Sequence, residues 1–218
     1  MLIIVGANRS AATALRRELL KKAVLSEHLS FRQLPDAIRE RPYVSAVLYL
    51  ADKSYKAAAS AASFLRKQKP TLVQGLLFAG DTQSDDALSA FDFVLPPTSD
   101  TSLLCVEMIR AAILRTRCDI SKRIVGSLHF SLLDKRFRYL MNSFSMCDTH
   151  TALLSYLMQI YPSGASSAEL SELCFYPLGY KARTNVVHAV NAINRMAEER
   201  GIPSLIALSN EKGYFLMP

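Results

Sequence analysis

The sequence lacks the features that would place it in a membrane or mark it for export. Half of its 218 residues are hydrophobic, yet no run of about 18 uncharged apolar residues occurs, so no membrane-spanning helix is predicted. The opening stretch MLIIVGANRS has neither a basic leader nor a long apolar segment, which argues against a signal peptide. The four cysteines are scattered without a CxxC pair, which indicates reduced thiols in a cytoplasmic protein.

Motifs of catalysis and of cofactor binding are also missing. Neither GxGxxG nor GxxxxGK[ST] occurs, so the turn after the first apolar run is not a recognised phosphate cradle. The histidines and cysteines share no ligand spacing, so no metal site is predicted. Cys147 and His150 would share one helix turn, but no third group orients them as a nucleophile pair. We therefore predict no enzyme, no catalytic residue and no cofactor.

The positive charge is unevenly distributed along the chain. The net charge is +7, which fits a polyanionic partner. Residues 1–123 carry 18 Lys and Arg against 12 Asp and Glu, whereas residues 124–218 carry 8 against 7. The C-terminal part is therefore nearly neutral.

Short apolar runs alternate with helical patterns through the first half of the chain. The runs, each expected to form a strand, are residues 1–6, 29–34, 43–50, 72–79 and 91–95. The stretches between them have helical spacing or helix-capping residues, and a last helix is expected over residues 99–117. Five strands alternating with helices predict an α/β fold, a doubly wound parallel five-stranded sheet.

The C-terminal stretch 181–216 predicts a helix followed by a hairpin. Val186, Val190, Ile193 and Ala197 have the spacing of one buried helical face. The opposite face carries amide, imidazole and guanidinium groups, which can pair with base edges and phosphates. Gly201 should end the helix, and residues 210–213 have the chemistry of a turn between two strands.

Residues 128–180 predict the remainder of an α+β domain. Residues 128–133 and 137–140 indicate a small antiparallel sheet, and Asp148 and Ser166 or Ser167 can begin two helices. We expect a first domain over 1–118, a linker over 119–127 and a second domain over 128–218.

Arg183-Thr184, His188 and Gly213-Tyr214 carry a resemblance to a known family. In order and spacing they resemble the recognition helix and the wing of OmpR/PhoB-type response regulators, although Asn210-Glu211 depart from the wing pattern. The resemblance covers nearly the whole chain. It implies a receiver domain followed by a winged helix-turn-helix domain that binds double-stranded DNA.

The receiver chemistry is absent from the matching positions. Gly6-Ala7 stand where the family has an acidic pair, and Leu50-Ala51 stand at the phospho-acceptor, with Asp52 beyond them. Phe78 and Pro96 replace the family's Thr/Ser and Lys. Because Mg²⁺ needs oxygen ligands and phosphoryl transfer needs charge neutralisation, we expect a pseudo-receiver that is independent of phosphorylation.

The resemblance and the polar helix face together predict a sequence-specific transcription regulator. The expected DNA-binding residues are Lys181, Arg183, Thr184, Asn185, His188, Asn191, Asn194, Arg195, Lys212 and Tyr214. The three asparagines would face bases, and Lys181, Arg183 and Arg195 would meet phosphates. The alternative is a protein-interaction module, a pseudo-receiver adaptor that binds a protein partner and no longer binds DNA.

The last helix of the first half is apolar around much of its circumference. Leu103, Val106, Arg110 and Ile113 lie on one side, while Leu104, Met108, Ala111 and Ala112 lie on the other. A surface helix with one buried face would not need both. We expect the first side to be the interface of a homodimer.

Overall fold

The computed structural model describes residues 1–80, 86–116, 121–179 and 184–217, and the chain divides into two compact units. One contains Met1–Arg16 and Ser26–Ile120, and the other contains Ser121–Pro218 together with Arg17–Leu25. Within the described ranges, no helix is both long and apolar enough to cross a membrane.

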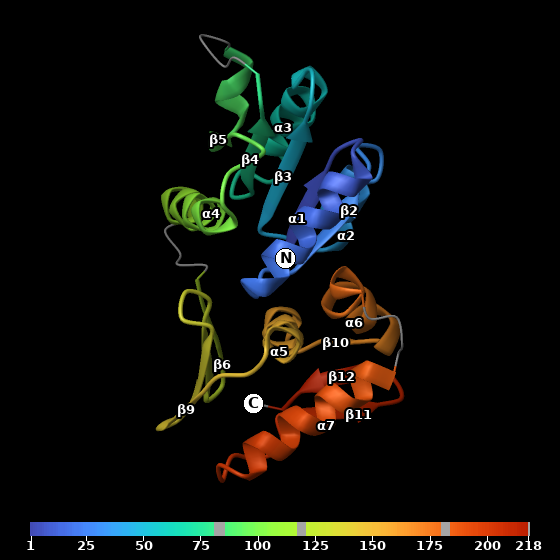
Figure 1. Cartoon of the computed structure of the whole chain (residues 1–218), viewed down its shortest axis with the longest axis vertical. Helices are drawn as coiled ribbons and strands as arrows, with labels where there is room; N and C mark the ends of the chain where they lie inside the picture. The colour runs from blue at the N-terminus through green and yellow to red at the C-terminus, as the bar shows by residue number, and fades with distance from the viewer. Residues whose placement is uncertain (81–85, 117–120, 180–183, 218) are drawn as a thin grey trace. The chain divides into compact units, whose positions relative to one another are not determined.

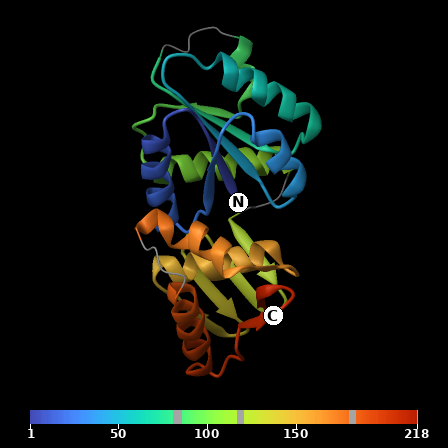
Figure 2. The same ribbon diagram turned by 90° about the vertical axis from the view of Figure 1, so that its right-hand side faces the viewer.

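A five-stranded parallel sheet in the order β2-β1-β3-β4-β5 is the centre of the first unit (Figure 1). Helix α1 lies on one face and α2 and α3 lie on the other (Figure 2), while α4 contacts β4 and β5. Its elements are β1 (Leu2–Val5), α1 (Arg9–Lys21), β2 (Ser26–Leu29), α2 (Leu34–Glu40), β3 (Ala46–Ala51), α3 (Lys56–Gln68), β4 (Val73–Phe78), the 3-10 helix η1 (Asp86–Ala90), β5 (Phe93–Leu95) and α4 (Thr101–Thr116). Every residue of β1 and β4 is buried, as expected for parallel strands covered on both sides. The doubly wound parallel sheet is confirmed.

The second strand and second helix differ from the expected boundaries. Residues 29–34 were expected to form a strand, but β2 ends at Leu29 and α2 begins at Leu34. The Gln33 side chain accepts hydrogen bonds from both the backbone N–H and the hydroxyl of Ser30, which stabilises a turn there. Pro35 sits in the first turn of α2, where its missing N–H costs nothing. Local side-chain bonding therefore overrode the alternating pattern.

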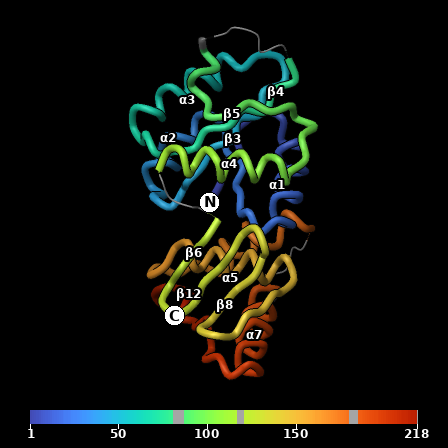
Figure 3. The backbone as a smooth tube through the Cα atoms, turned by 90° about the vertical axis from the view of Figure 1, so that its left-hand side faces the viewer, coloured from blue at the N-terminus to red at the C-terminus, as the bar shows by residue number. Residues whose placement is uncertain are grey.

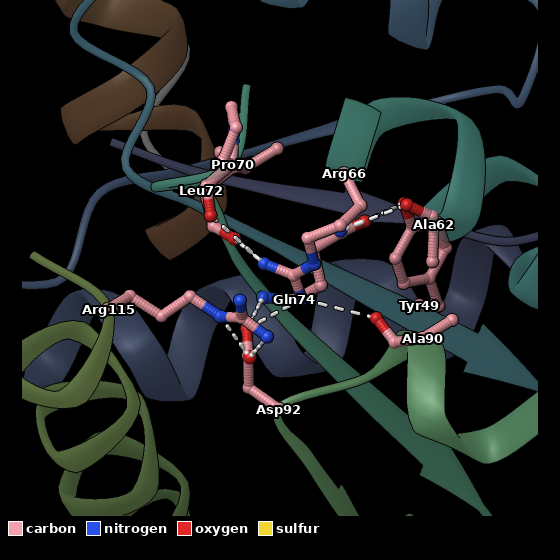
Figure 4. A network of polar contacts seen from close by, with 9 residues as sticks. All are labelled: Tyr49, Ala62, Arg66, Pro70, Leu72, Gln74, Ala90, Asp92 and Arg115. Carbon is pink, nitrogen blue, oxygen red and sulfur yellow. Dashed lines mark hydrogen bonds and ion pairs between the residues drawn. The ribbon is translucent and has the colours of Figure 1, made fainter. Parts of the chain in front are cut away.

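Asp92 is the centre of a polar network that ties α3, β4 and α4 together (Figure 4). Its buried carboxylate pairs with Arg66 at 3.1 Å and with Arg115 at 2.5 Å, and it accepts the backbone N–H of Gln74 at 2.7 Å. The Gln74 side chain accepts a hydrogen bond from the Tyr49 hydroxyl at 2.9 Å. Burial raises the pKa of Tyr49 well above its usual value, so this hydroxyl stays protonated and donates.

The second unit begins with a four-stranded antiparallel sheet in the order β6-β7-β8-β9 (Figure 3). Its strands are β6 (Lys122–Val125), β7 (Leu128–Ser131), β8 (Arg136–Tyr139) and β9 (Asn142–Phe144). Residues 122–125, expected within the linker, thus form an edge strand. Phe130, Phe137 and Phe144 stack on its inner face, with ring centroids 4.5 and 5.6 Å apart.

Three helices and a small second sheet complete this unit. They are α5 (Asp148–Ile160), β10 (Gly164–Ala165), α6 (Ser167–Cys174), the 3-10 helix η2 (Tyr176–Leu178), α7 (Thr184–Glu198), β11 (Ile206–Ser209) and β12 (Gly213–Leu216). The Ser166 hydroxyl caps α6 by accepting the Glu169 N–H at 3.1 Å, as expected. Strands β11 and β12 form a hairpin, and β10 pairs with β12. This arrangement is a winged helix-turn-helix fold, which confirms the expected α+β class.

Candidate nucleic-acid interface

Helix α7 presents one buried face and one exposed face. Val186, Ile193 and Ala197 are fully buried and Val190 nearly so, which confirms the expected apolar face. His188, Asn191 and Arg195 are exposed on the opposite side, and Asn185 is half-buried. Gly201, with φ of +68°, follows the helix in the left-handed conformation that commonly ends helices. A helix fixed by its apolar face in this way can place amide and imidazole groups against a ligand.

Asn194 was expected to face bases, and this expectation is wrong. Its side-chain Oδ1 accepts the backbone N–H groups of Leu205 and Ile206 at 3.0 Å each, and its Nδ2 donates to the Ile206 carbonyl at 2.8 Å. Leu205 and Ile206 are buried, so these backbone groups need protein partners. The Asn194 amide is therefore used to hold β11 against α7.

Tyr214 was also expected among the DNA-binding residues, and the structure corrects this as well. Its side chain is only 7 % exposed, and its backbone pairs with Leu208 and Ala165 in the three-stranded sheet. The ring belongs to the core beneath the hairpin.

The wing is the hairpin of β11 and β12 with its turn Asn210–Lys212. Ser209 pairs with Gly213, so three residues form the connection, and the Ser209 hydroxyl accepts the Glu211 N–H at 3.2 Å. Gly213 has φ of +69°, and a Cβ there would come within 2.4 Å of the Ala165 carbonyl oxygen. The exposed Lys212 places its Nζ 5.9 Å from the centre of the Phe215 ring, at the edge of the wing.

Two of the expected phosphate-binding residues, Lys181 and Arg183, lie outside the described residues, and Thr184 is the first residue of α7. Arg195 is exposed and lies 3.8 Å from the Glu199 carboxylate one turn later. An exposed pair of this kind contributes little stability, so Arg195 is available to a phosphate at small cost.

The carboxyl ends of β1 and β3 meet where a receiver would hold its phosphoryl group. Gly6 follows β1, Leu50 and Ala51 end β3, and exposed Asp52 comes after them. Asp52 lines a hollow of about 320 Å³, with walls that include Ala7, Phe31 and Leu50. Over the described part of the chain, no three His, Cys, Asp or Glu side chains cluster as a metal site.

Helix α4 leaves apolar side chains in solvent. Leu103, Val106 and Ile113 are 45, 52 and 45 % exposed, and Leu114 is 74 % exposed. Arg110 on the same side is exposed and lies 3.5 Å from Glu107. Leu104, Met108, Ala111 and Ala112 face the sheet and are buried. The two sides of the helix are thus distributed as expected, while the homodimer itself stays a prediction.

The sequence matches no family model and no curated protein. A similar solved structure is that of the response regulator DrrB, a Thermotoga maritima OmpR/PhoB homolog, with 13 % identity, a TM-score of 0.40 and coverage of 100 % of this chain and 98 % of that chain. A redox sensor from streptococci, described as evolved from two-component response regulators, has 15 % identity and a TM-score of 0.43, with 100 % and 99 % covered.

The DNA-binding domain of the response regulator AdeR, solved in complex with an intercistronic region, has 15 % identity and a TM-score of 0.39. It covers 43 % of this chain, and 96 % of that domain is matched. These structures are of the class that the sequence resembles. The fold class follows from the strand order and connectivity of this chain.

Proposed function

We propose that this chain is a sequence-specific DNA-binding regulator of transcription that acts without phosphorylation of its receiver-like unit. The observation that carries the proposal is helix α7, whose buried stripe and Asn194 fix it to the wing while Asn185, His188 and Asn191 lie on its other side. In this fold the second helix of the helix-turn-helix enters the major groove.

The chemistry of the exposed helix face suits base edges better than phosphates alone. An asparagine amide can pair in bidentate fashion with adenine, and one such pair contributes about 1–3 kcal/mol of discrimination. With Asn194 committed to β11, Asn185 and Asn191 are the amides left for this role. Lys181, Arg183, Arg195 and Lys212 would then contact phosphates and set the register on the duplex.

Because α7 carries few cations, we expect a monomer to have low affinity for DNA and the protein to bind DNA as a dimer. Each ionic contact adds about 0.9 to the salt slope of log K, so two to four contacts give a slope of about 2 to 4. We propose that a homodimer through Leu103, Val106, Arg110 and Ile113 binds two half-sites roughly one helical turn apart. Apolar groups that are about half exposed on α4 support this arrangement.

The alternative function is a pseudo-receiver adaptor that binds a protein partner through α4 and does not bind DNA. The exposed Leu103, Val106, Ile113 and Leu114 favour this alternative too, because a partner protein would cover them equally well. The two functions separate in a DNA-binding measurement. Fluorescence anisotropy of the full chain with genomic fragments tests the proposal, and an adaptor would bind none of them above random duplex.

A further inference from the structure

The outer face of the β6–β9 sheet gathers cations that the proposed DNA-binding helix does not have. Strand side chains alternate between faces, so the stacked phenylalanines on the inner face fix which residues point outward. Lys122, Ser131 and Arg136 pair across three strands in one row. His129, Arg138 and Ser143 pair across three strands in the next row. These six residues are called the outer sheet face below.

The outer sheet face is hollowed and strongly positive. All six residues line a single hollow of about 330 Å³, together with Asp134, its one acidic side chain among the described residues. The Asp134 carboxylate accepts a hydrogen bond from the Ser131 hydroxyl at 2.8 Å. The guanidinium groups of Arg136 and Arg138 against this one carboxylate leave a positive surplus in the hollow.

Three other cations of this unit are engaged in bonds within the protein. Lys135 pairs with Asp148 at 2.9 Å, and Arg200 donates to the Met196 carbonyl at 2.9 Å. Arg123 points inward and donates to the Ser155 carbonyl at 3.0 Å, and burial lowers its pKa to about 10. The side chains of Arg136 and Arg138, by contrast, have no ion pair or hydrogen bond to any described residue. These two guanidinium groups can therefore bind an anion without breaking a bond within the protein.

Spacing and chemistry identify the kind of anion. Neighbouring strands lie about 4.8 Å apart, so Lys122 and Arg136 are roughly 10 Å apart at their Cα atoms, and Arg138 is about 7 Å further along β8. Phosphate groups in series can meet cations spread over such distances. The guanidinium fork matches phosphate oxygens in bidentate fashion. The Ser143 hydroxyl and the His129 ring can add hydrogen bonds.

An acidic peptide fits this site less well than a phosphate chain. A peptide that binds to a sheet gains most from pairing its backbone along an exposed edge, and a sheet face presents no backbone groups to pair with. A peptide lying on this face would leave its backbone N–H groups without partners. A polyphosphate or a sugar-phosphate backbone has no such groups. The site therefore favours phosphates.

The outer sheet face also points away from α7. Helix α5 packs on the sheet through β6 and contacts α7 on its other side, so it lies between the two (Figures 1 and 3). The phosphates bound by one surface are then not those bound by the other. Binding at the sheet does not depend on base recognition by α7.

We propose that the outer sheet face is a binding site for phosphate groups in series, supplied either by a nucleic-acid backbone or by a free oligophosphate. Arg136 and Arg138 bind the phosphates by their guanidinium forks, and Lys122 binds the next phosphate across the sheet. The site goes beyond the proposed recognition helix, because it gives the same unit a second surface that binds an anionic partner.

The test titrates the full chain with inorganic triphosphate by calorimetry and with labelled random duplex DNA by anisotropy over a salt series. The variant is Arg136→Gln with Arg138→Gln, and the matched control is Arg32→Gln with Lys67→Gln, two exposed cations of the first unit. We expect the variant to weaken triphosphate binding at least tenfold and the control less than twofold. Ser143→Glu, which adds a carboxylate at an exposed lining position, should weaken it as well.

The anisotropy measurement with duplex DNA distinguishes the two sources of phosphate. A fall of about 1.8 in the salt slope of the arginine variant, for two lost contacts, identifies a nucleic-acid backbone as the source. An unchanged slope with lost triphosphate binding identifies a free oligophosphate. Wild-type affinity of the variant for both ligands overturns the proposal, as does a poly-glutamate peptide that competes as strongly as triphosphate. Asn191→Ala should leave triphosphate binding intact, so failure of the recognition helix and failure of this site are distinguishable.

Discussion

Asn194 bonds both backbone polar groups of Ile206, accepting its N–H at 3.0 Å and donating to its carbonyl at 2.8 Å. The same amide oxygen accepts the N–H of Leu205. One side chain therefore replaces a strand partner for the start of β11. It fixes the wing to α7, so the two parts of the proposed DNA-binding surface keep a constant relation.

Replacing Asn194 by Ala should lower the free energy of unfolding by about 2–3 kcal/mol, because two buried N–H groups and one carbonyl lose their partner. Asn191→Ala, three residues earlier on the exposed side, is the matched control and should change it by less than about 0.5 kcal/mol. Urea unfolding of the full chain measures both. Equal values for the two variants would show that the Asn194 bonds contribute nothing to stability.

Replacing Asp92 should destabilise the protein more than replacing any other acidic residue of the first unit. Its buried carboxylate compensates Arg66 and Arg115 and binds the Gln74 N–H, so Asp92→Ala leaves two cations without their partner. The expected loss is about 3 kcal/mol of unfolding free energy. Asp36→Ala removes the exposed pair with Arg39 and should cost less than about 1 kcal/mol. Comparable losses in thermal unfolding would contradict the role given to the network.

The elements with long apolar periodicity could be predicted from the sequence, and the errors arose where polar side chains bond locally. The buried stripe of α7 follows from spacing alone. The role of Asn194 could not be predicted in this way, because an amide on a polar helix face gives the same sequence pattern whether it binds solvent, a base or a neighbouring strand. The outward cations of β8 were missed although Arg136 and Arg138 flank Phe137. That alternation becomes informative only once the strand pairing places Lys122 beside them.

The full chain should be a dimer at micromolar concentration. Leu103→Glu with Val106→Glu places charges on the exposed side of α4 and should give a monomer with an unchanged circular dichroism spectrum, since both side chains are about half exposed. Phe64→Glu on α3, where Phe64 is 48 % exposed, is the matched control and should leave the dimer intact. Sedimentation velocity distinguishes these states, and a wild-type monomer would rule out this interface.

Phosphoryl donors should have no effect on the protein. Gly6, Ala7 and Leu50 provide no Mg²⁺ ligand, and Asp52 lies beyond the strand end. Acetyl phosphate or beryllofluoride with Mg²⁺ should therefore leave the mass, the sedimentation coefficient and the DNA affinity unchanged. Asp52→Asn is the control for an unexpected acceptor. A gain in DNA affinity that this substitution abolishes would contradict phosphorylation independence.

The recognition helix is tested most directly by the preference of the full chain for a selected genomic site over a scrambled one, measured by anisotropy at several salt concentrations. Asn185→Ala with Asn191→Ala should reduce this preference at least tenfold, since each amide–adenine pair contributes about 1–3 kcal/mol, and should leave the salt slope unchanged. Gln68→Ala, an exposed amide on α3, should have no effect. Arg183→Ala should weaken binding to both sequences alike and lower the slope by about 0.9. If the double asparagine variant keeps the full preference for the selected site, these side chains are solvated helix surface, and α7 is not the element that reads DNA.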